Sequence, residues 1–455
     1  MKYLNLNITF LFCLLFMSGY AQDTIFLDRQ KALDMAMHNN RLIKIFHYKT
    51  KSARAGLAEM KSHYWPRLEL EASYAYNSNP DIHAYKGEFS HIYHDLIDVG
   101  WIDEILEEYF PLPPKDMVLI HGEEFFYKTN LSLYQPVTQL TTVNTGRKIA
   151  ETDYEISKVE KEKVMSEIKV GVTELYYGIL IENRYEEAAL LELEYKLRER
   201  QDAINAHEAG EVLEVDVFAL KAEVNEKEQE LLQIRNKKEK YVLTLKQMLA
   251  LPAGAEPVLA NDTSMQAIPG NLDEYIRSGL LNNHELQIAG LTVEKAQYGI
   301  DAAKKEYIPE LAFFMQYNFN HGIPLYPDSY FLAGFNLKWT LMAAGQRKAL
   351  VSQREALQAE AYEDLEYKKI SLRNEVEKVW LDIQYAHQLI KTADEALRAR
   401  KEALRLSEDA YLEKEILESE LISARAELMK AEADLFAARA NLIIQHARLA
   451  ALTDY

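Results

Sequence analysis

The stretch Val376-Glu-Lys-Val-Trp-Leu-Asp-Ile383-Gln-Tyr-Ala-His-Gln-Leu-Ile390 carries an apolar residue at every seventh position. The series continues through Leu397 and Leu404 to Tyr411, and residues 352–411 contain neither glycine nor proline. A sustained seven-residue apolar repeat is typical of a helix that packs against others along a continuous seam. About 60 residues at 1.5 Å each would make a helix of roughly 90 Å, whereas an average helix has about 11–12 residues.

A second apolar ladder follows the first directly. Its members are Leu421, Leu428, Leu435, Leu442 and Leu449, again seven residues apart. A turn is expected between the two ladders, at residues 411–417. We therefore predict that residues 346–452 form one tall antiparallel helical hairpin.

The first 21 residues predict export from the cytoplasm. They combine one charge, Lys2, with a short apolar run and the small-residue cleavage site Gly19-Tyr20-Ala21, as in a secretory signal peptide. Cys13, the only cysteine, follows Phe12 within this run, so we expect neither a lipid anchor nor disulfides in the mature chain. Removing Lys2 changes the net charge from −19 to −20, which disfavours binding to nucleic acid. The mature chain has no run of 18 apolar residues, so we expect no transmembrane helix.

The chain also contains an internal repeat. His38-Asn39-Asn40 recurs as Leu281-Asn282-Asn283, and Ala209-Gly210-Glu211-Val212-Leu213 corresponds to Glu413-Lys414-Glu415-Ile416-Leu417. The offset falls from 243 to 204 between these motifs, so the first copy has 39 extra residues, which we place in an insertion at 77–124. We predict a signal peptide at 1–21, a first repeat at 22–251, a linker at 252–270 and a second repeat at 271–455. Each repeat is expected to begin with a helix, at 28–62 and 273–306, and to end in a tall hairpin, at 145–249 and 346–452.

Between these helices the apolar period changes to two. Leu68-Glu-Leu-Glu-Ala-Ser-Tyr-Ala-Tyr76 alternates in this way after Pro66, and a similar segment follows Pro309. The four predicted strands are residues 68–76 and 127–135 in the first repeat, and 311–320 and 331–341 within the pair 310–341. Half-apolar strands of about ten residues suit a tilted bilayer crossing, and Tyr and Trp residues near their ends suit a membrane interface. The expected fold class is a mixed α and β membrane protein.

Two alternatives concern the structure that these four strands form. Four amphipathic strands can form a soluble sandwich, but the signal peptide, the strand length and the aromatic residues favour a membrane. In hydrocarbon the open edges of four strands would leave backbone groups unsatisfied at several kcal/mol each, so copies must pool their strands. Two copies would give eight strands, which fill their own interior, and three would give twelve, with room for an aqueous lumen.

The order of these features resembles a TolC-like outer-membrane efflux protein (outer membrane factor) over essentially the whole mature chain. The resemblance rests on the two-repeat layout, the Asn-Asn helix opening, the step from proline to strand, and the junctions Leu133-Tyr-Gln-Pro-Val137 and Leu337-Lys-Trp-Thr-Leu341. It implies a homotrimer that shares one twelve-strand barrel in the outer membrane, with very long helices forming a periplasmic α-barrel. It also implies two partners, a periplasmic adaptor (membrane fusion) protein and an inner-membrane transporter.

The resemblance further implies two functional regions in the helices. Adaptor-contact tips would be formed by Gly210, Glu211, Val212 and Leu213 in the first hairpin and by Lys414, Glu415 and Ile416 in the second. The family often narrows its periplasmic entrance with acidic side chains on the second repeat's first tall helix, where the candidates here are Glu402, Arg405, Glu408 and Asp409. A carboxylate repeated by threefold symmetry would favour cations. The alternative is a solvated helix face with i,i+4 ion pairs.

The sequence contains no recognisable catalytic motif. The insertion carries His83, His91, His94 and His121, and His91-x-x-His94 has a spacing that can bind a metal. We prefer an extracellular loop with incidental histidines, because no carboxylate–histidine spacing completes a site. Serine and histidine do not occur in a nucleophile-elbow context, so we expect no enzyme and no cofactor.

We therefore predict a passive export conduit that receives substrates from an inner-membrane pump and adaptor, in tripartite efflux or type I secretion. The alternative is a non-conducting, periplasm-spanning coiled-coil scaffold anchored in the outer membrane. Drugs, metals and proteins all remain open as substrates, because the pump would choose among them. Opening is expected at the periplasmic end, by untwisting of the hairpin at 346–452 when the adaptor binds the tips.

Overall fold

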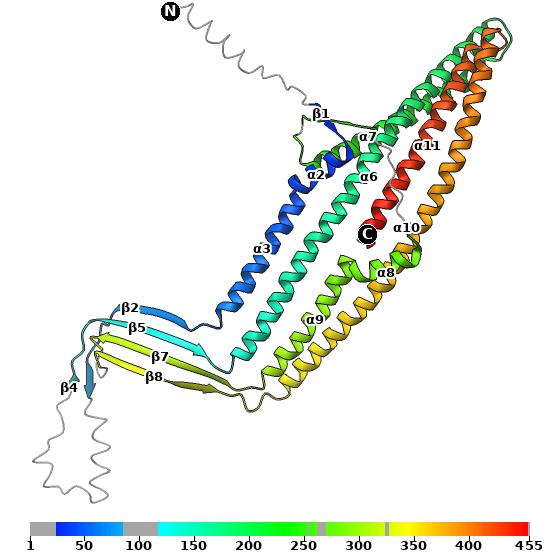
Figure 1. Cartoon of the computed structure of the whole chain (residues 1–455). Helices are drawn as coiled ribbons and strands as arrows, with labels where there is room; N and C mark the ends of the chain where they lie inside the picture. Colours follow the sequence, from blue (N-terminus) through cyan, green and yellow to red (C-terminus); the bar gives the residue numbers. More distant parts are fainter. Residues whose placement is uncertain (1–23, 85–116, 253, 262–269, 324–326, 454–455) are drawn as a thin grey trace, which may run out of the picture. The chain divides into compact units, whose positions relative to one another are not determined.

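The computed structural model describes residues 24–84, 117–252, 254–261, 270–323 and 327–453 (Figure 1). The predicted signal peptide and residues 85–116 of the predicted insertion lie outside the described residues. The chain divides into two compact units. The sheet unit comprises Ala55–Glu151 and Lys295–Leu357, and the helical unit comprises Met1–Arg54, Thr152–Glu294 and Gln358–Tyr455. Each unit therefore draws on both repeats.

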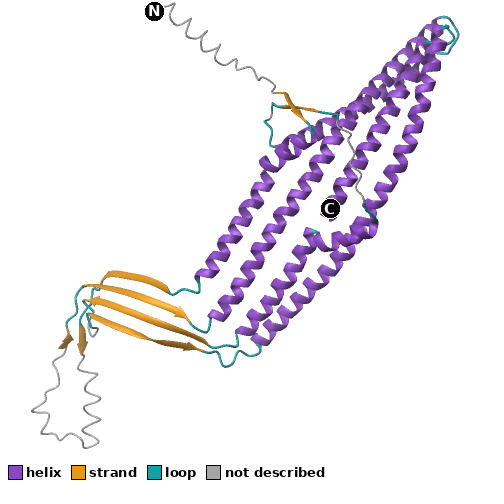
Figure 2. Ribbon diagram, in the orientation of Figure 1, coloured by secondary structure: helices purple, strands orange, loops and turns teal. Residues whose placement is uncertain are grey.

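The sheet unit contains one antiparallel four-stranded sheet in the order β2-β5-β7-β8 (Figure 2). Its strands are β2 Arg67–Tyr76, β5 Phe125–Pro136, β7 Glu310–His321 and β8 Ser329–Lys338. The prediction of two strands from each repeat is confirmed. The predicted end of the last strand at Leu341 is wrong, because β8 ends at Lys338, opposite Glu310 at the start of β7. Pro309, which precedes Glu310, has no N–H to continue the ladder.

Four long helices form the two predicted hairpins. They are α6 Leu140–Glu208, α7 Glu214–Leu249, α10 Gln346–Leu412 and α11 Glu418–Thr453. The seven-residue ladders are buried over part of their length, since Val376, Ile383, Leu442 and Leu449 are between 0% and 2% exposed. Nearer the turn, Leu397 and Leu404 are only half-buried. None of the helices in the described part of the chain has the length and hydrophobicity of a membrane-spanning segment.

Each predicted opening helix is in fact two helices, so the expectation of one continuous helix per repeat is wrong. The first repeat has α2 Arg29–Asn39 and α3 Arg41–Ser62, and the second has α8 Leu272–Asn282 and α9 His284–Lys305. The break falls at Asn40 in one case and at Asn283 in the other. Asp28 caps α2, with Lys31 N donating to its Oδ1 at 2.7 Å, and Asp273 lies in the first turn of α8.

The broken helices provide a docking point for the returning tall helices. Asn40 Oδ1 accepts from Leu42 N at 2.8 Å, and its Nδ2 donates to Met248 O near the end of α7 at 2.9 Å. The equivalent bonds of the second repeat join Asn283 to Glu285 N at 2.9 Å and to Leu452 O at 3.1 Å. A helix end leaves carbonyl groups without intrahelical partners. The second asparagine of each Asn-Asn motif therefore satisfies one such carbonyl and starts the next helix.

Two short strand pairs were not predicted from the sequence. In the helical unit, β1 Thr24–Leu27 pairs parallel with β6 Glu256–Leu259, and the buried Tyr176 of α6 donates its hydroxyl to Ala260 O at 2.6 Å. In the insertion, β3 Ile82–Ala84 pairs antiparallel with β4 Met117–Ile120. Strands of three or four residues are too short to show a period of two.

Replacing Asn40 tests the docking point. Asn40→Ala leaves the carbonyl of Met248 and the first turn of α3 without their partner at a buried position, so we expect the free energy of unfolding to fall by about 1–3 kcal/mol. Thermal unfolding followed by circular dichroism measures the change. Asn39→Ala is the matched control, because its exposed side chain precedes the break, and it should leave the transition unchanged. Equal effects of the two variants would contradict this role.

Candidate functional site

One face of the four-stranded sheet exposes large apolar side chains. A row across the sheet consists of the register partners Leu70, Leu131, Tyr317 and Phe331. Their side chains are 42–71% exposed. The same face also exposes Leu68, Tyr74, Phe125, Met315, Phe319, Phe335 and Leu337. A continuous exposed apolar surface of this kind marks contact with lipid or with another protein.

The opposite face of the sheet carries most of the polar side chains, with Phe126, Tyr134, Phe314 and Leu332 as exceptions. The adjacent row consists of Glu71, Asn130, Asn318 and Tyr330, and the next rows add Glu69, Lys128, Ser132 and Gln316. Asn318 and Asn320 are each only 3% exposed. Within the described part of the chain, the buried Oδ1 atoms of Asn130 and Asn320 accept no hydrogen bond. The sheet therefore exposes an apolar face and gathers its polar side chains on the other, the reverse of the arrangement in a soluble protein.

The two outer strands are left open. β2 and β8 each pair with only one neighbour in the described chain, so the outer edge of each has free N–H and C=O groups. Edges of this kind act as templates for further strands. With apolar side chains on one face, the sheet is suited to become part of a closed membrane barrel made from several chains.

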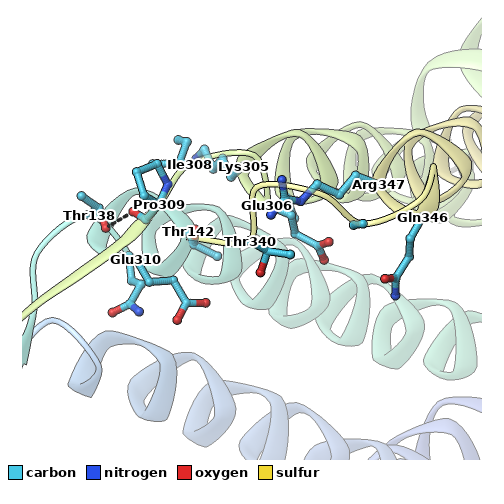
Figure 3. A pocket seen from close by; sticks show the side chains of 13 residues that line it. Thr138, Thr142, Lys305, Glu306, Ile308, Pro309, Glu310, Thr340, Gln346 and Arg347 are labelled. Carbon is cyan, nitrogen blue, oxygen red and sulfur yellow. Dashed lines mark hydrogen bonds between the residues drawn. The ribbon is translucent and has the colours of Figure 1, made fainter. Parts of the chain in front are cut away.

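A cleft of about 340 Å³ lies where the strands join their helices (Figure 3). Thr138 links two of these junctions, because its Oγ1 donates to Pro309 O at 2.7 Å and accepts from Leu311 N at 2.8 Å. The charged side chains that line the cleft are Lys305, Glu306, Glu310 and Arg347. Since both signs of charge occur together in an open cleft, its groups lack the dry setting that acid–base catalysis uses. The contacts of Thr138 fasten the start of α6 to β7.

The two hairpin tips share one backbone conformation. Gly210 (φ 78°) and Lys414 (φ 62°) both lie in the left-handed region, after the last turn of α6 and of α10. In the first tip, Glu211 N donates to Ala206 O at 2.9 Å, and in the second Glu415 N donates to Ala410 O at 2.9 Å. These bonds span the last helical turn as in a Schellman motif. The structure thus places Gly210 and Lys414 at equivalent positions.

The tips expose apolar side chains and lie at the same end of the helical unit (Figure 1). Leu213 is 70% exposed and Leu417 is 57% exposed, while Val212 and Ile416 are half-buried. Arg198 of α6 contacts Glu418 of α11 at 2.9 Å and joins the two hairpins near this end. The predicted tip residues are therefore brought together on one accessible surface.

Three of the four entrance candidates lie together on α10. Arg405 Nη2 is 2.8 Å from Glu402 Oε1, and Arg405 Nη1 is 2.9 Å from Asp409 Oδ2. The hydrogen bond from Arg405 holds the pKa of the Glu402 carboxyl below its ordinary value. Glu408 instead lies 3.6 Å from Arg425 of α11. All four side chains are exposed in the single chain, where such pairs contribute little to stability.

The residues missed from the sequence are those that order the helices. Lys237 of α7 binds Glu182 of α6 at 2.5 Å, although the Glu182 side chain is only 5% exposed. Tyr185 of α6 donates to Asp434 Oδ1 of α11 at 2.8 Å, and burial together with this bond raises the tyrosine pKa. Lys401 of α10 lies 4.0 Å from Glu432 of α11. The helical unit therefore has the helix order α7-α6-α11-α10. These partners lie far apart in the sequence, so no local pattern identifies them.

Among the described residues, no group of three or more His, Cys, Asp or Glu side chains is placed to hold a metal ion. His91 and His94 of the candidate metal spacing lie outside these residues.

Comparison with known proteins agrees with this geometry. Residues 275–454 match the family model of the outer membrane efflux proteins. The fold matches the outer membrane channel CmeC of Campylobacter jejuni with a TM-score of 0.71 and 14% identity, over 93% of this chain and 85% of that one. The outer membrane protein VceC of Vibrio cholerae matches with a TM-score of 0.67 and 13% identity, over 93% of this chain and 96% of that one. Residues 275–454 thus match the outer membrane efflux protein family, and the whole chain has the fold of outer membrane channels.

This partial family match and the shared fold agree with the resemblance inferred from the sequence, the mixed α and β membrane fold and the outer membrane location. The open state of the Neisseria gonorrhoeae channel MtrE also matches this chain, with a TM-score of 0.67 and 14% identity, over 93% of this chain and 88% of that one. No curated protein matches its sequence. The family match over residues 275–454 and the channel fold of the whole chain support export across the outer membrane as its function.

Adjacent residues of β2 test the two faces of the sheet. Leu70→Lys places a charge on the apolar face near the middle of the strand, and we expect it to disfavour membrane insertion by about 2–4 kcal/mol. Glu71→Lys places the same charge on the polar face, and we expect normal insertion. The fraction of folded protein recovered from outer membranes measures the difference. Equal yields of the two variants would contradict the assignment of the faces.

Proposed function

We propose that three copies of this efflux protein form one passive export channel. Each copy contributes four strands to a twelve-strand barrel, and the long helices form a periplasmic α-barrel. The observation that carries this proposal is the sheet with an exposed apolar face, a largely polar opposite face and two open edges. Three copies are favoured over two because an eight-strand barrel fills its own interior with side chains.

We infer that the channel is the last part of a tripartite efflux or type I secretion system. An inner-membrane transporter and a periplasmic adaptor would supply the substrate, and the adaptor would bind the hairpin tips. The accessible tip residues Leu213 and Leu417 support this assignment, because exposed apolar side chains at a helix end suit a protein interface. The pump determines the substrate class, and we assign no enzymatic activity to the channel itself.

The periplasmic entrance is proposed to lie at Glu402, Arg405, Glu408 and Asp409 of α10. Threefold symmetry would repeat the Glu402–Arg405–Asp409 cluster around an axis and make it a charged ring of net negative sign. Opening would follow when the adaptor binds the tips and the hairpin at 346–452 untwists. Cross-links between these hairpins in neighbouring copies should then block export, and normal export by cross-linked channels would refute this gating step.

A non-conducting scaffold is the second candidate function. It uses the same helices and the same membrane anchor, and it differs only in having no open lumen. The polar face of the sheet favours a lumen, because it carries the charged side chains of Glu71 and Lys128, which are stable where water solvates them.

Conductance separates these two functions. We expect the purified protein to have the mass of a trimer in detergent and to give small, cation-favouring openings in a planar bilayer. Glu71→Lys, which changes the charge of the proposed lumen, should reduce the preference for cations. A trimer that conducts neither as the wild type nor as the Arg405→Gln variant would favour the scaffold. A soluble monomer would refute the barrel.

The entrance cluster predicts a pH dependence. Arg405 depresses the Glu402 pKa, so Glu402 stays ionised, and the ion pair stays formed, until the pH falls through this lowered value. Arg405→Gln removes both the depression and a positive charge. We expect stronger cation preference at neutral pH and its loss at a higher pH than in the wild type, measured by reversal potentials in a salt gradient. Lys391→Gln removes the same charge elsewhere on α10 and is the control, and the same pH profile for both variants would contradict the assignment.

A further inference from the structure

We propose that the two tips recognise different surfaces of the adaptor, and that Lys414 binds a carboxylate on it. The inference rests on the proposed function, which makes the adaptor the partner of the tips. The backbones of the tips are equivalent, so the difference lies in their side chains alone.

Lys414 occupies a backbone position that suits glycine. Its φ of 62° lies in the left-handed region, where a residue with a Cβ is strained, and the first tip has Gly210 there. Positive φ by itself does not identify a functional residue in this chain. Ala250 (φ 53°) and Ala344 (φ 43°) adopt the same region at other helix ends. Alanine presents no charged group there, whereas lysine presents an ammonium.

The side chain of Lys414 is exposed and uncommitted. Glu413 and Glu415 are its sequence neighbours, yet Lys414 forms no ion pair or side-chain hydrogen bond among the residues that the structure describes. Arg405, nine residues earlier in the chain, instead binds two carboxylates. A strained residue whose charged side chain has no intramolecular role is explained by a contact with another molecule.

The flanking residues define the chemistry of that contact. Glu413 and Glu415 are exposed on either side of Lys414, so the matching surface presents a carboxylate between basic side chains. The first tip offers apolar contact instead, since Val215 is 63% and Phe218 is 59% exposed. At the corresponding positions of the second tip, Ser419 is buried and Ile422 is half-buried. Both tips expose a leucine, Leu213 and Leu417, but only the first adds Val215 and Phe218, and only the second adds a lysine between two glutamates.

Affinity measurements on full-length channel variants test the proposal. The probe is the purified adaptor that copurifies with the wild-type trimer, measured against immobilised trimer. Lys414→Gly keeps the turn and removes the charge, and we expect about tenfold weaker binding, with a shallower dependence on salt. Lys414→Arg keeps the charge and should bind within about twofold of the wild type. In thermal unfolding, Lys414→Gly should be at least as stable as the wild type, because glycine relieves the strain.

Ala250→Gly is the control, because it relieves the same backbone strain at the far end of α7 from the tips. It should raise stability without changing adaptor affinity. Wild-type affinity and salt dependence in Lys414→Gly would overturn the proposal for Lys414 while leaving the export function intact. An adaptor that binds trimers lacking both tip sequences as well as the wild type would instead overturn the tip assignment in the proposed function.

Discussion

A backbone N–H or C=O without a partner costs several kcal/mol in hydrocarbon, where no water replaces the lost hydrogen bond. The outer edges of β2 and β8 carry such groups along about ten residues each, so the sum far exceeds the few kcal/mol by which a folded domain is stable. A single copy therefore cannot be stable in a membrane while both edges of its sheet are unpaired. Closure with further copies removes the cost without any change in the sheet itself. Symmetric assembly is thus a requirement of this sheet in lipid.

The contrast between the two faces of the sheet fixes its register. Side chains alternate between faces, so a slip of one residue in the β5–β7 pairing would move Tyr317 to the polar face and Asn318 to the lipid face. The exposed aromatic residues on one face would be unstable in water, whereas contact with lipid removes that cost. The polar residues on the other face are stable where water solvates them, so the two faces together support a membrane setting.

Much of this fold was predictable, because long helices and membrane strands leave periodic signals. The ladder from Val376 to Tyr411 gave α10 to within a few residues, and alternation gave all four strands of the sheet. The breaks at Asn40 and Asn283 were missed because their decisive bonds, to Met248 O and Leu452 O, join residues far apart in the sequence. The positions of the candidate site residues were likewise easier to predict than their chemistry. Alignment of the repeats placed Lys414 at a tip. Only the structure shows that Arg405 pairs with Glu402 and that Lys414 has no ion pair among the described residues.

The two repeats share the docking contact made inside the chain and differ in the side chains exposed at their tips. The docking asparagine bonds a backbone carbonyl in both repeats, so its chemistry is independent of the neighbouring side chains, and it is the same in each. The exposed tip side chains Glu211, Leu213, Lys414 and Glu415 face solvent in the described chain, so packing inside the chain does not determine their identity. A partner that senses only backbone shape would meet equivalent tips around the ring. A partner that contacts the side chains would meet two kinds of tip in alternation. A contact with Lys414 would then occur once per copy, which is three times around the ring.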